Sequence, residues 1–400
     1  MSYNNLFVSF YSDDARFFYY FSKKIPNKSF FYSIFFSGVL YMFFKRIISL
    51  NFFKKFNKNI ELPSSLKQII HYEIVQNKFK IETLKKNAIN YIYFFNHLIN
   101  SKKIKYVYLS GDSRMIVKCA EYAAKQNKCI IRYFEQGPFG TTILDEKGVN
   151  KNCSFRHSSF DEDLSEISIS SKEKISWNKY FRVFDFVLYN MFKYKNNHIY
   201  NDVASLTSNT LISKKNKLHN NYILLVLQVP NDANMILNSP NFSNHFDIVK
   251  WTYSNLPKSF QLVIREHPNF INLYEKKLYK FVEENDRINF DYKLLNNSIK
   301  FASLVIVNNS TVGIEALFQN KILVILGDSY YDNLETVFKL KDINDTDILN
   351  NAIKSNINKK INISFINFLL KKELIGFHFR DKYFNLNDKV LMEKVTNLYK

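Results

Sequence analysis

The stretch YILLVLQVPND, from Tyr222 to Asp232, joins an uninterrupted apolar run to a polar turn that ends in a carboxylate. The apolar run lies between an asparagine and a proline, a pattern typical of a parallel-sheet strand that is buried on both faces. Ligands of open α/β sheets bind at the carboxyl ends of the strands, so Asp232 is a candidate functional residue. The alternative is that Asp232 only caps a helix predicted from the following residues, ANMILNS.

The rest of the chain repeats the alternation of strand and helix. The segments that predict strands are NLFVSF (5–10), KIKYVYLSGDSR (103–114), CIIRYFEQG (129–137), QLVIREHP (261–268), LVIVNNS (304–310) and ILVILG (322–327). Helices are predicted between them at 115–128, 245–256, 273–285 and 311–319, and a further long helix is predicted at 178–195. This alternation indicates parallel sheets covered by helices.

The length of 400 residues suits two domains rather than one core. The chain turns polar from Asn196 to Asn221, and NTLISKKNKLHNN (209–221) is the best candidate linker. We therefore predict an α/β protein of glycosyltransferase-B-like architecture, with two Rossmann-like domains that face a cleft. The expected boundaries are 1–210 for the amino-terminal domain, 211–380 for the carboxyl-terminal domain, and 381–400 for a terminal helix that packs back onto the first.

The charge of the chain predicts an anionic partner. Lysine and arginine exceed aspartate and glutamate by 56 − 36 = 20. The basic residues are scattered, without an arginine-rich arm, zinc-finger spacing or RNP-type strand, so no nucleic-acid partner is expected. The remaining interpretations are an acidic substrate or an anionic membrane surface.

The amino terminus has no signal-like segment, and Cys119, Cys129 and Cys153 have neither metal-ligand spacing nor an obvious disulfide framework. Together these features predict a reducing, cytoplasmic location. The aromatic run from Phe30 to Phe44 is shorter than the roughly 20 residues that span a bilayer. A buried core helix is the preferred interpretation of this run. The alternative is a helix in the membrane interface, which would place the protein peripherally on the inner membrane.

Four segments together resemble the bacterial capsule and O-antigen proteins that transfer the acidic sugar Kdo from CMP-Kdo. They are GDSRMIVKCAEYAAKQNK leading to FEQGPFGTTILDEKGVN, then LQVPNDANMILNSPNF, VIREHPN and ASLVIVNNSTVGIEALFQNKILVILGDSYYD. The resemblance covers roughly residues 105–332. It implies a retaining β-Kdo glycosyltransferase that acts on a lipid-linked surface polysaccharide, with the first domain on the acceptor side and the second binding the CMP-sugar.

The resemblance also implies donor-binding residues: Gln228, Arg265, His267, Asn309, Ser310, Thr311 and Glu315. Their chemistry agrees, because a strand-to-helix turn such as NNST presents free N–H groups to a phosphate. The alternative for Ser310 or Thr311 is ordinary helix capping. His267 would donate to the leaving phosphate, and Arg265 would pair with a carboxylate or phosphate.

Retention through two inversions requires an enzyme nucleophile. Asp232 matches the acid of the family's QxPxD segment and is the candidate nucleophile. Glu135, in FEQG at the end of another strand, is the candidate general acid/base; the alternative is that it only orders the glycine turn after it. A single phosphate does not demand a metal, so neither a metal nor another cofactor is expected. The acidic triplet Asp161 to Asp163 follows no apolar strand and is interpreted as a solvated loop.

Two other functions remain open at this point. An inverting transferase that uses CMP-sialic acid would employ Asp232 as a general base. A catalytically inert scaffold of a polysaccharide assembly complex would use none of these residues chemically.

Overall fold

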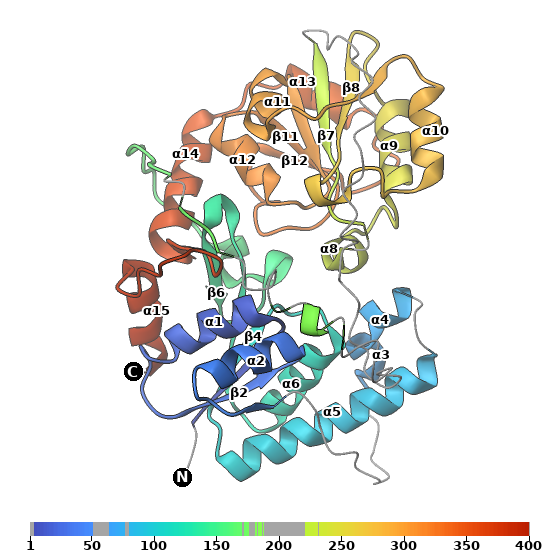
Figure 1. Cartoon of the computed structure of the whole chain (residues 1–400). Coiled ribbons are helices and arrows are strands. Elements are labelled where there is room, and N and C mark those ends of the chain that lie inside the picture. The colour runs from blue at the N-terminus through green and yellow to red at the C-terminus, as the bar shows by residue number, and fades with distance from the viewer. Residues whose placement is uncertain are drawn as a thin grey trace. The chain divides into compact units, whose positions relative to one another are not determined.

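The computed structural model describes residues 4–50, 64–76, 80–169, 172–175, 181, 183–185, 187, 221–230 and 232–399. The chain divides into two compact units (Figure 1). Unit 1 comprises residues 1–149, 169–204 and 371–400, and unit 2 comprises residues 150–168 and 205–370.

Unit 2 is built on a six-stranded sheet in which every strand is parallel to its neighbours. The strands, in chain order, are β7 (Tyr222–Val226), β8 (Gln261–Arg265), β9 (Ile288–Phe290), β10 (Leu304–Val307), β11 (Ile322–Ile325) and β12 (Val337–Lys339). Their spatial order is β9-β8-β7-β10-β11-β12. This is the strand order of a doubly wound Rossmann sheet, whose direction of winding reverses between β7 and β10.

The helices of unit 2 connect these strands. They are α8 (Ala233–Leu237), α9 (His245–Ser254), α10 (Lys276–Glu283), α11 (Leu295–Phe301), α12 (Val312–Phe318), α13 (Ile348–Lys354) and α14 (Lys359–Phe368). The two central strands β7 and β10 are buried along their whole length, as their unbroken apolar sequences predict. Alternate residues of the strands pack into one core cluster with α9 and α10, so the remaining residues face the other side of the sheet.

Unit 1 has a seven-stranded mixed sheet in the order β13-β6-β5-β4-β1-β2-β3. The strands are β1 (Asn5–Ser9), β2 (Ser29–Ser33), β3 (Ser49–Leu50), β4 (Tyr106–Ser110), β5 (Ile130–Gln136), β6 (Thr142–Asp145) and β13 (Leu374–Ile375). Strands β1 to β5 are parallel, whereas β6 and β13 are antiparallel additions. The parallel part again has the order 3-2-1-4-5, with its reversal between β1 and β4. The predicted pair of Rossmann-like domains is therefore confirmed.

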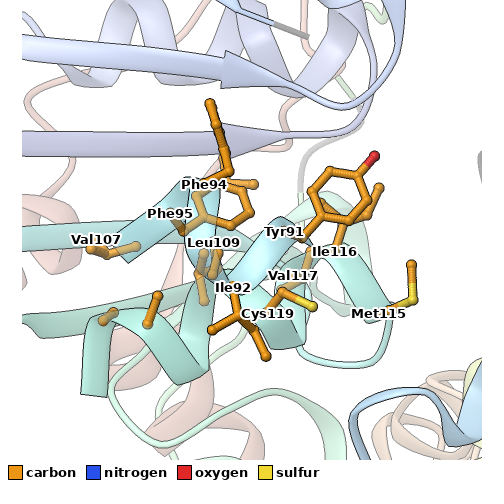
Figure 2. Packing of buried hydrophobic residues seen from close by; sticks show 14 of the residues in the cluster. Tyr91, Ile92, Phe94, Phe95, Val107, Leu109, Met115, Ile116, Val117 and Cys119 are labelled. Carbon is orange, nitrogen blue, oxygen red and sulfur yellow. The ribbon is translucent and has the colours of Figure 1, made fainter. Parts of the chain in front are cut away.

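The helices of unit 1 are α1 (Ser12–Phe21), α2 (Phe36–Phe44), α3 (Leu66–Ile69), α4 (His71–Val75), α5 (Ile81–Lys102), α6 (Met115–Gln126) and α15 (Lys389–Tyr399). Figure 2 shows side chains of α5, β4 and α6 meeting in the core on one face of the sheet. The buried face of α6 carries Ala120, Ala123 and Ala124, whose small side chains allow close packing. The opposite face of the sheet is covered by an aromatic cluster in which Phe7 stacks on Tyr108 with ring centroids 4.5 Å apart.

The carboxyl-terminal helix α15 belongs to this aromatic cluster through Leu391, Val395 and Leu398. The Tyr399 hydroxyl donates to the Asn5 side-chain oxygen at 2.8 Å, which links the two ends of the described chain. Within the described residues, the unit boundaries differ from the sequence expectation in two segments. Residues 371–380 belong to unit 1, because β13 pairs with β6, and residues 150–168 belong to unit 2.

The interpretation of Phe30 to Phe44 as one helix is wrong. The run forms strand β2, a short turn and helix α2, because its first residues pair in parallel with β1. Aromatic residues favour strands as readily as helices when a neighbouring strand is available. Most of the run is buried, but Phe43 and Phe44 are 72% and 66% exposed. The long helix predicted at 178–195 and the linker predicted before residue 221 lie largely outside the described residues.

Candidate functional site

Most of the predicted donor-binding residues gather at the carboxyl edge of the unit 2 sheet. Gln228 and Asp232 follow β7, Arg265 and His267 lie at the end of β8, and the turn 309–311 follows β10. The register aligns Val226 with Arg265 and with Val307, so the three strands end at the same level. This is the point where the winding reverses, and such points hold the ligands of doubly wound folds.

Asp232 is the N-cap of α8, and its Oδ1 accepts the Asn234 backbone N–H at 2.8 Å. Asp232 therefore caps the helix after β7, which was the alternative interpretation of this residue. Helix α8 has only five residues and follows β7 directly, so the cap also fixes the carboxylate at the end of the central strand. The side chain is partly exposed, which leaves it accessible to a ligand.

Asn309 holds α8 against the end of β10. Its Nδ2 donates to the carbonyl oxygens of Asn234 at 3.1 Å and Asn238 at 3.0 Å. The preceding Asn308 accepts from the Ser239 hydroxyl at 3.2 Å. Asn309 is consequently a positioning residue for Asp232, since it fixes the helix that this acid caps.

Gln228 is the most buried polar residue at the end of β7. Its side chain is 7% exposed, and neither Oε1 nor Nε2 has a hydrogen-bond partner in the described part of the chain. Its backbone carbonyl does have one, because it accepts the Tyr274 hydroxyl at 2.9 Å. The Oδ1 of Asn309 is also buried without a partner among the described residues.

His267 presents one ring nitrogen to its own loop. Its Nδ1 accepts the Asn269 backbone N–H at 3.3 Å, and burial lowers the pKa of the ring below its ordinary value. A neutral ring whose Nδ1 accepts carries its proton on Nε2, which makes Nε2 a donor. His267 is therefore suited to donate a neutral hydrogen bond to an anion.

Glu266 orders the loop that carries His267. Its Oε1 accepts the Tyr279 hydroxyl at 2.6 Å and the Asn272 backbone N–H at 3.0 Å, and its Oε2 accepts the Tyr292 hydroxyl at 2.9 Å. Sequence analysis did not select Glu266, Tyr279 or Tyr292. The three donors account for the burial of this carboxylate, so its role is structural.

Arg265 and Glu315 interact electrostatically, and each affects the pKa of the other. Burial lowers the pKa of Arg265, and Asp291 and Glu315 oppose that shift. Burial raises the pKa of Glu315, and Arg265 opposes it. Arg265 also donates to the carbonyl of Lys293 at 2.5 Å, so part of its guanidinium is already bound within the unit.

The turn from Asn309 to Thr311 is fixed from two sides. Ser310 Oγ accepts the Val312 N–H at 3.3 Å, so Ser310 does cap α12, whereas Thr311 makes no side-chain cap. The Tyr331 hydroxyl donates to the Ser310 carbonyl. Gly313 is required beside it, because a Cβ at that position would lie 2.5 Å from the Tyr331 hydroxyl.

In unit 1, Glu135 lies near the end of β5, one residue beyond the level at which β4 ends. Its Oε1 accepts the Gln136 N–H at 2.8 Å. Its Oε2 lies 3.7 Å from the point that a Cβ on Gly111 would occupy, and Gly111 has φ +72°. A glycine after β4 thus lets the backbone turn directly beside this carboxylate.

Asp14 was missed by sequence analysis, and it lies at the reversal point of unit 1. Its Oδ2 accepts the Phe10 N–H at 3.2 Å and the Ser110 hydroxyl at 3.1 Å, which ties the turn after β1 to the end of β4. Burial and the neighbouring Asp13 raise the pKa of Asp14 to about 6, against opposition from its two donors and Arg380. The sequence could have indicated Asp14, because SDDAR places acids soon after the first strand, as the segment after β7 places Asp232.

Within the described ranges, no cluster of three or more His, Cys, Asp or Glu side chains is arranged to hold a metal ion. Asp161 and Glu162 are exposed, and Asp163 lies in a segment docked on α14, where Asn367 donates to its carbonyl at 2.8 Å. Across those same ranges, no helix combines the length and apolar character that crossing a bilayer requires.

Comparison with known proteins places the chain among capsule proteins. The family model described as "Capsule polysaccharide biosynthesis protein" matches residues 105–335, more than half of the chain. The Sinorhizobium fredii protein FixF is 32% identical over 126 residues, which are 30% of this chain and 30% of FixF. The Escherichia coli capsule polysaccharide export protein KpsS is 35% identical over 127 residues, 29% of this chain and 32% of KpsS. The matches thus span about a third of the length of these curated relatives.

Solved structures resemble the chain only distantly. The β-Kdo 2,7 transferase of Thermosulfurimonas dismutans KpsC is 15% identical, with a TM-score of 0.37, over 72% of this chain and 87% of that one. The UDP-N-acetylglucosamine 2-epimerase of Rickettsia bellii is 13% identical, with a TM-score of 0.39, over 99% and 96%. At these scores neither structure bears on the activity.

The family match extends from β4 of unit 1 to the loop before β12 of unit 2, so it includes Glu135, Asp232 and the whole carboxyl edge of the unit 2 sheet. The chain belongs to the capsule polysaccharide biosynthesis protein family.

Proposed function

We propose that this protein is a retaining glycosyltransferase that moves Kdo from CMP-Kdo to a lipid-linked surface polysaccharide of the capsule or O-antigen type. The observation that carries the proposal is the convergence of Gln228, Asp232, His267 and the turn after β10 at the reversal point of a Rossmann sheet. The choice of Kdo as the sugar and CMP as the nucleotide rests on the four sequence segments that resemble β-Kdo transferases. Membership of the capsule family supports the polysaccharide acceptor.

In this proposal the phosphate of the donor binds between β8 and β10. His267 donates from Nε2, and backbone N–H groups of the turn at Ser310 and Thr311 supply further donors. Arg265 supplies positive charge near the leaving group. Glu315 interacts with Arg265 and opposes the lowering of its pKa by burial. No metal or other cofactor is part of the proposal.

Asp232 acts as the nucleophile. Its carboxylate attacks the anomeric carbon, the bond from that carbon to the phosphate oxygen breaks, and CMP leaves with the bonding pair. Oδ1 accepts the Asn234 N–H, which fixes the orientation of the carboxylate at the end of β7. An acceptor hydroxyl then displaces Asp232 from the same carbon, and Glu135 takes the hydroxyl proton.

The experiment that tests this proposal is intact-protein mass measurement after incubation with CMP-Kdo. A Kdo-sized increment that peptide mapping places on Asp232 is expected. Asp232→Asn should retain donor binding but lose transfer by orders of magnitude. Glu135→Gln should still form the adduct and then transfer it slowly, because only the second step needs a base.

Other results would contradict parts of the proposal. Turnover of CMP-sialic acid without an adduct would favour the inverting alternative, with Asp232 as a general base. Absence of CMP release from either donor would favour an inert scaffold.

A further inference from the structure

The carboxamide of Gln228 is buried with no hydrogen-bond partner among the described residues, although it lies at the end of the central strand. Burial of an unpaired amide is costly, and native proteins keep such groups where another partner satisfies them. The unpaired Asn309 Oδ1 on the adjacent strand end adds a second acceptor at the same edge.

The alternation of β7 places this amide on a defined face of the sheet. Ile223, Leu225 and Leu227 pack into the core cluster that includes α9 and α10, so Gln228 faces the opposite side. Arg265 of β8 lies on that same face, because its neighbour Ile264 belongs to the core cluster. Gln228 thus ends the strand between the two strands whose turns carry the phosphate-binding groups.

We propose that the Gln228 carboxamide binds hydroxyl groups of the donor sugar. This residue would then recognise the sugar part of the donor and not its nucleotide. This inference rests on the proposed CMP-Kdo transfer. An amide offers two donors and one acceptor without charge, which matches hydroxyl groups that both donate and accept. The candidate nucleophile Asp232 follows four residues later, so the reacting sugar carbon has to lie near this strand end, with the phosphate held beyond it.

The test compares Gln228→Met, which keeps the side-chain length, with a matched control. Asn367→Leu is that control: Asn367 is 2% exposed in the same unit, and its amide donates to the carbonyls of Asp163 at 2.8 Å and Ser165 at 3.0 Å. Without ligand, Asn367→Leu should lower the melting temperature, and Gln228→Met should leave it unchanged or raise it. Gln228→Leu provides a second variant if Met does not fold.

Calorimetry with CMP-Kdo and with CMP then shows whether Gln228 contacts the sugar or the nucleotide of the donor. Gln228→Met should weaken CMP-Kdo binding about tenfold, as for one or two lost hydrogen bonds, and leave CMP binding unchanged. An equal loss for CMP would assign the amide to the nucleotide and overturn the inference. A fall in melting temperature like that of the control would overturn it as well, since the amide would then be bonded within the protein.

Failure of the proposed function gives a different result. Wild-type protein would then not bind CMP-Kdo, and binding of CMP alone would fit the alternative that uses CMP-sialic acid. If instead wild type binds CMP-Kdo and the variant binds it equally well, only the assignment of Gln228 is wrong.

Discussion

His267 is the side chain whose role at the residue scale follows most directly from its hydrogen bond. Nδ1 accepts from Asn269, so the neutral ring donates from Nε2. His267→Ala should weaken CMP binding by roughly tenfold or more, because a hydrogen bond to a charged group contributes about 1.5–3 kcal/mol. Calorimetry with CMP measures this effect.

His267→Asn serves as the control for folding, since asparagine also accepts from the backbone at a cap. It should retain the melting temperature of wild type while binding CMP as weakly as the alanine variant. Unchanged CMP affinity in both variants would show that His267 only caps its loop.

Asp14 gives a pH-dependent prediction. Its pKa is raised to about 6 by burial and by Asp13, so the folded protein holds a proton there that the unfolded chain releases near pH 4. The stabilising contribution is therefore complete below about pH 4 and is lost as pH rises through 6. Asp14→Asn should be more stable than wild type by about 1–3 kcal/mol at pH 7.5 and nearly equal to it at pH 4.

Urea unfolding at the two pH values measures this difference. The groups that face Asp14 are the Ser110 hydroxyl, the Phe10 N–H, Asp13 and Arg380. A variant less stable than wild type at pH 7.5 would mean that the ionised carboxylate stabilises the turn after β1.

At the scale of elements, helix α12 and its turn depend on a close approach between Gly313 and Tyr331. Gly313→Ala forces the buried Tyr331 ring to move, because the new Cβ would lie 2.5 Å from its hydroxyl. Overpacking of this kind costs about 1–3 kcal/mol. The variant should also weaken CMP binding, since the Tyr331 hydroxyl holds the Ser310 carbonyl.

A double variant checks the cause. Tyr331→Ala removes the hydroxyl and the two ring carbons that would lie 2.5, 2.7 and 2.8 Å from the new Cβ, so Gly313→Ala should cost less in that background than in wild type, as measured by denaturant unfolding. Equal costs in the two backgrounds would place the strain elsewhere.

A buried ion network fixes the segment 150–157 to unit 2. The fully buried Asp332 carboxylate accepts from Arg156 at 2.7 and 3.0 Å and from Lys339 at 2.6 Å. Asp332→Asn should destabilise the protein by about 3–5 kcal/mol, because Arg156 then loses its carboxylate and Lys339 keeps only Asp328, which lies 2.7 Å away. Limited proteolysis should also cut the segment 150–168 faster.

The exposed pair of Lys360 and Glu162 is the matched control for that network. Its atoms are 3.7 Å apart and both side chains are more than half exposed. Lys360→Met should change stability by less than about 1 kcal/mol. A comparable loss in both variants would mean that the buried network contributes no more than surface charge.

At the scale of the whole molecule, the two units repeat one plan. Each places an acid after its first strand, Asp14 after β1 and Asp232 after β7, and a polar turn after its fourth strand. Crossover connections in a doubly wound sheet leave a ligand site at that reversal point, whatever the ligand is. The sequence resemblance extended to Asp232 but not to Asp14, which lies before residue 105.

Peripheral binding to an anionic membrane also belongs to this scale, and we propose it from the net charge of +20 and the exposed Phe43 and Phe44. The protein should sediment with vesicles containing anionic lipid and be released by salt. Phe43→Ser with Phe44→Ser should reduce sedimentation without lowering the melting temperature. Retained sedimentation would leave charge alone as the cause, and a lowered melting temperature would identify the two rings as core.

The sequence by itself determined the parallel strands of unit 2 and the family. Runs such as ILLVL, LVIV and ILVI are buried on both faces, and the alternation with helices then permits few topologies. It also selected Asp232, Arg265, His267 and the turn at Asn309, because residues that follow parallel strands meet at one edge.

Only the tertiary structure decided the contacts between segments distant in sequence. The aromatic run at Phe30 became a strand because β1 was available to pair with it, and β13 joined unit 1 by pairing with β6. Likewise, the sequence does not reveal that Asn309 is bonded to α8 while the Gln228 amide is not bonded within the described chain. Local pattern sets which face a side chain occupies, but its partners depend on packing between elements that local pattern does not encode.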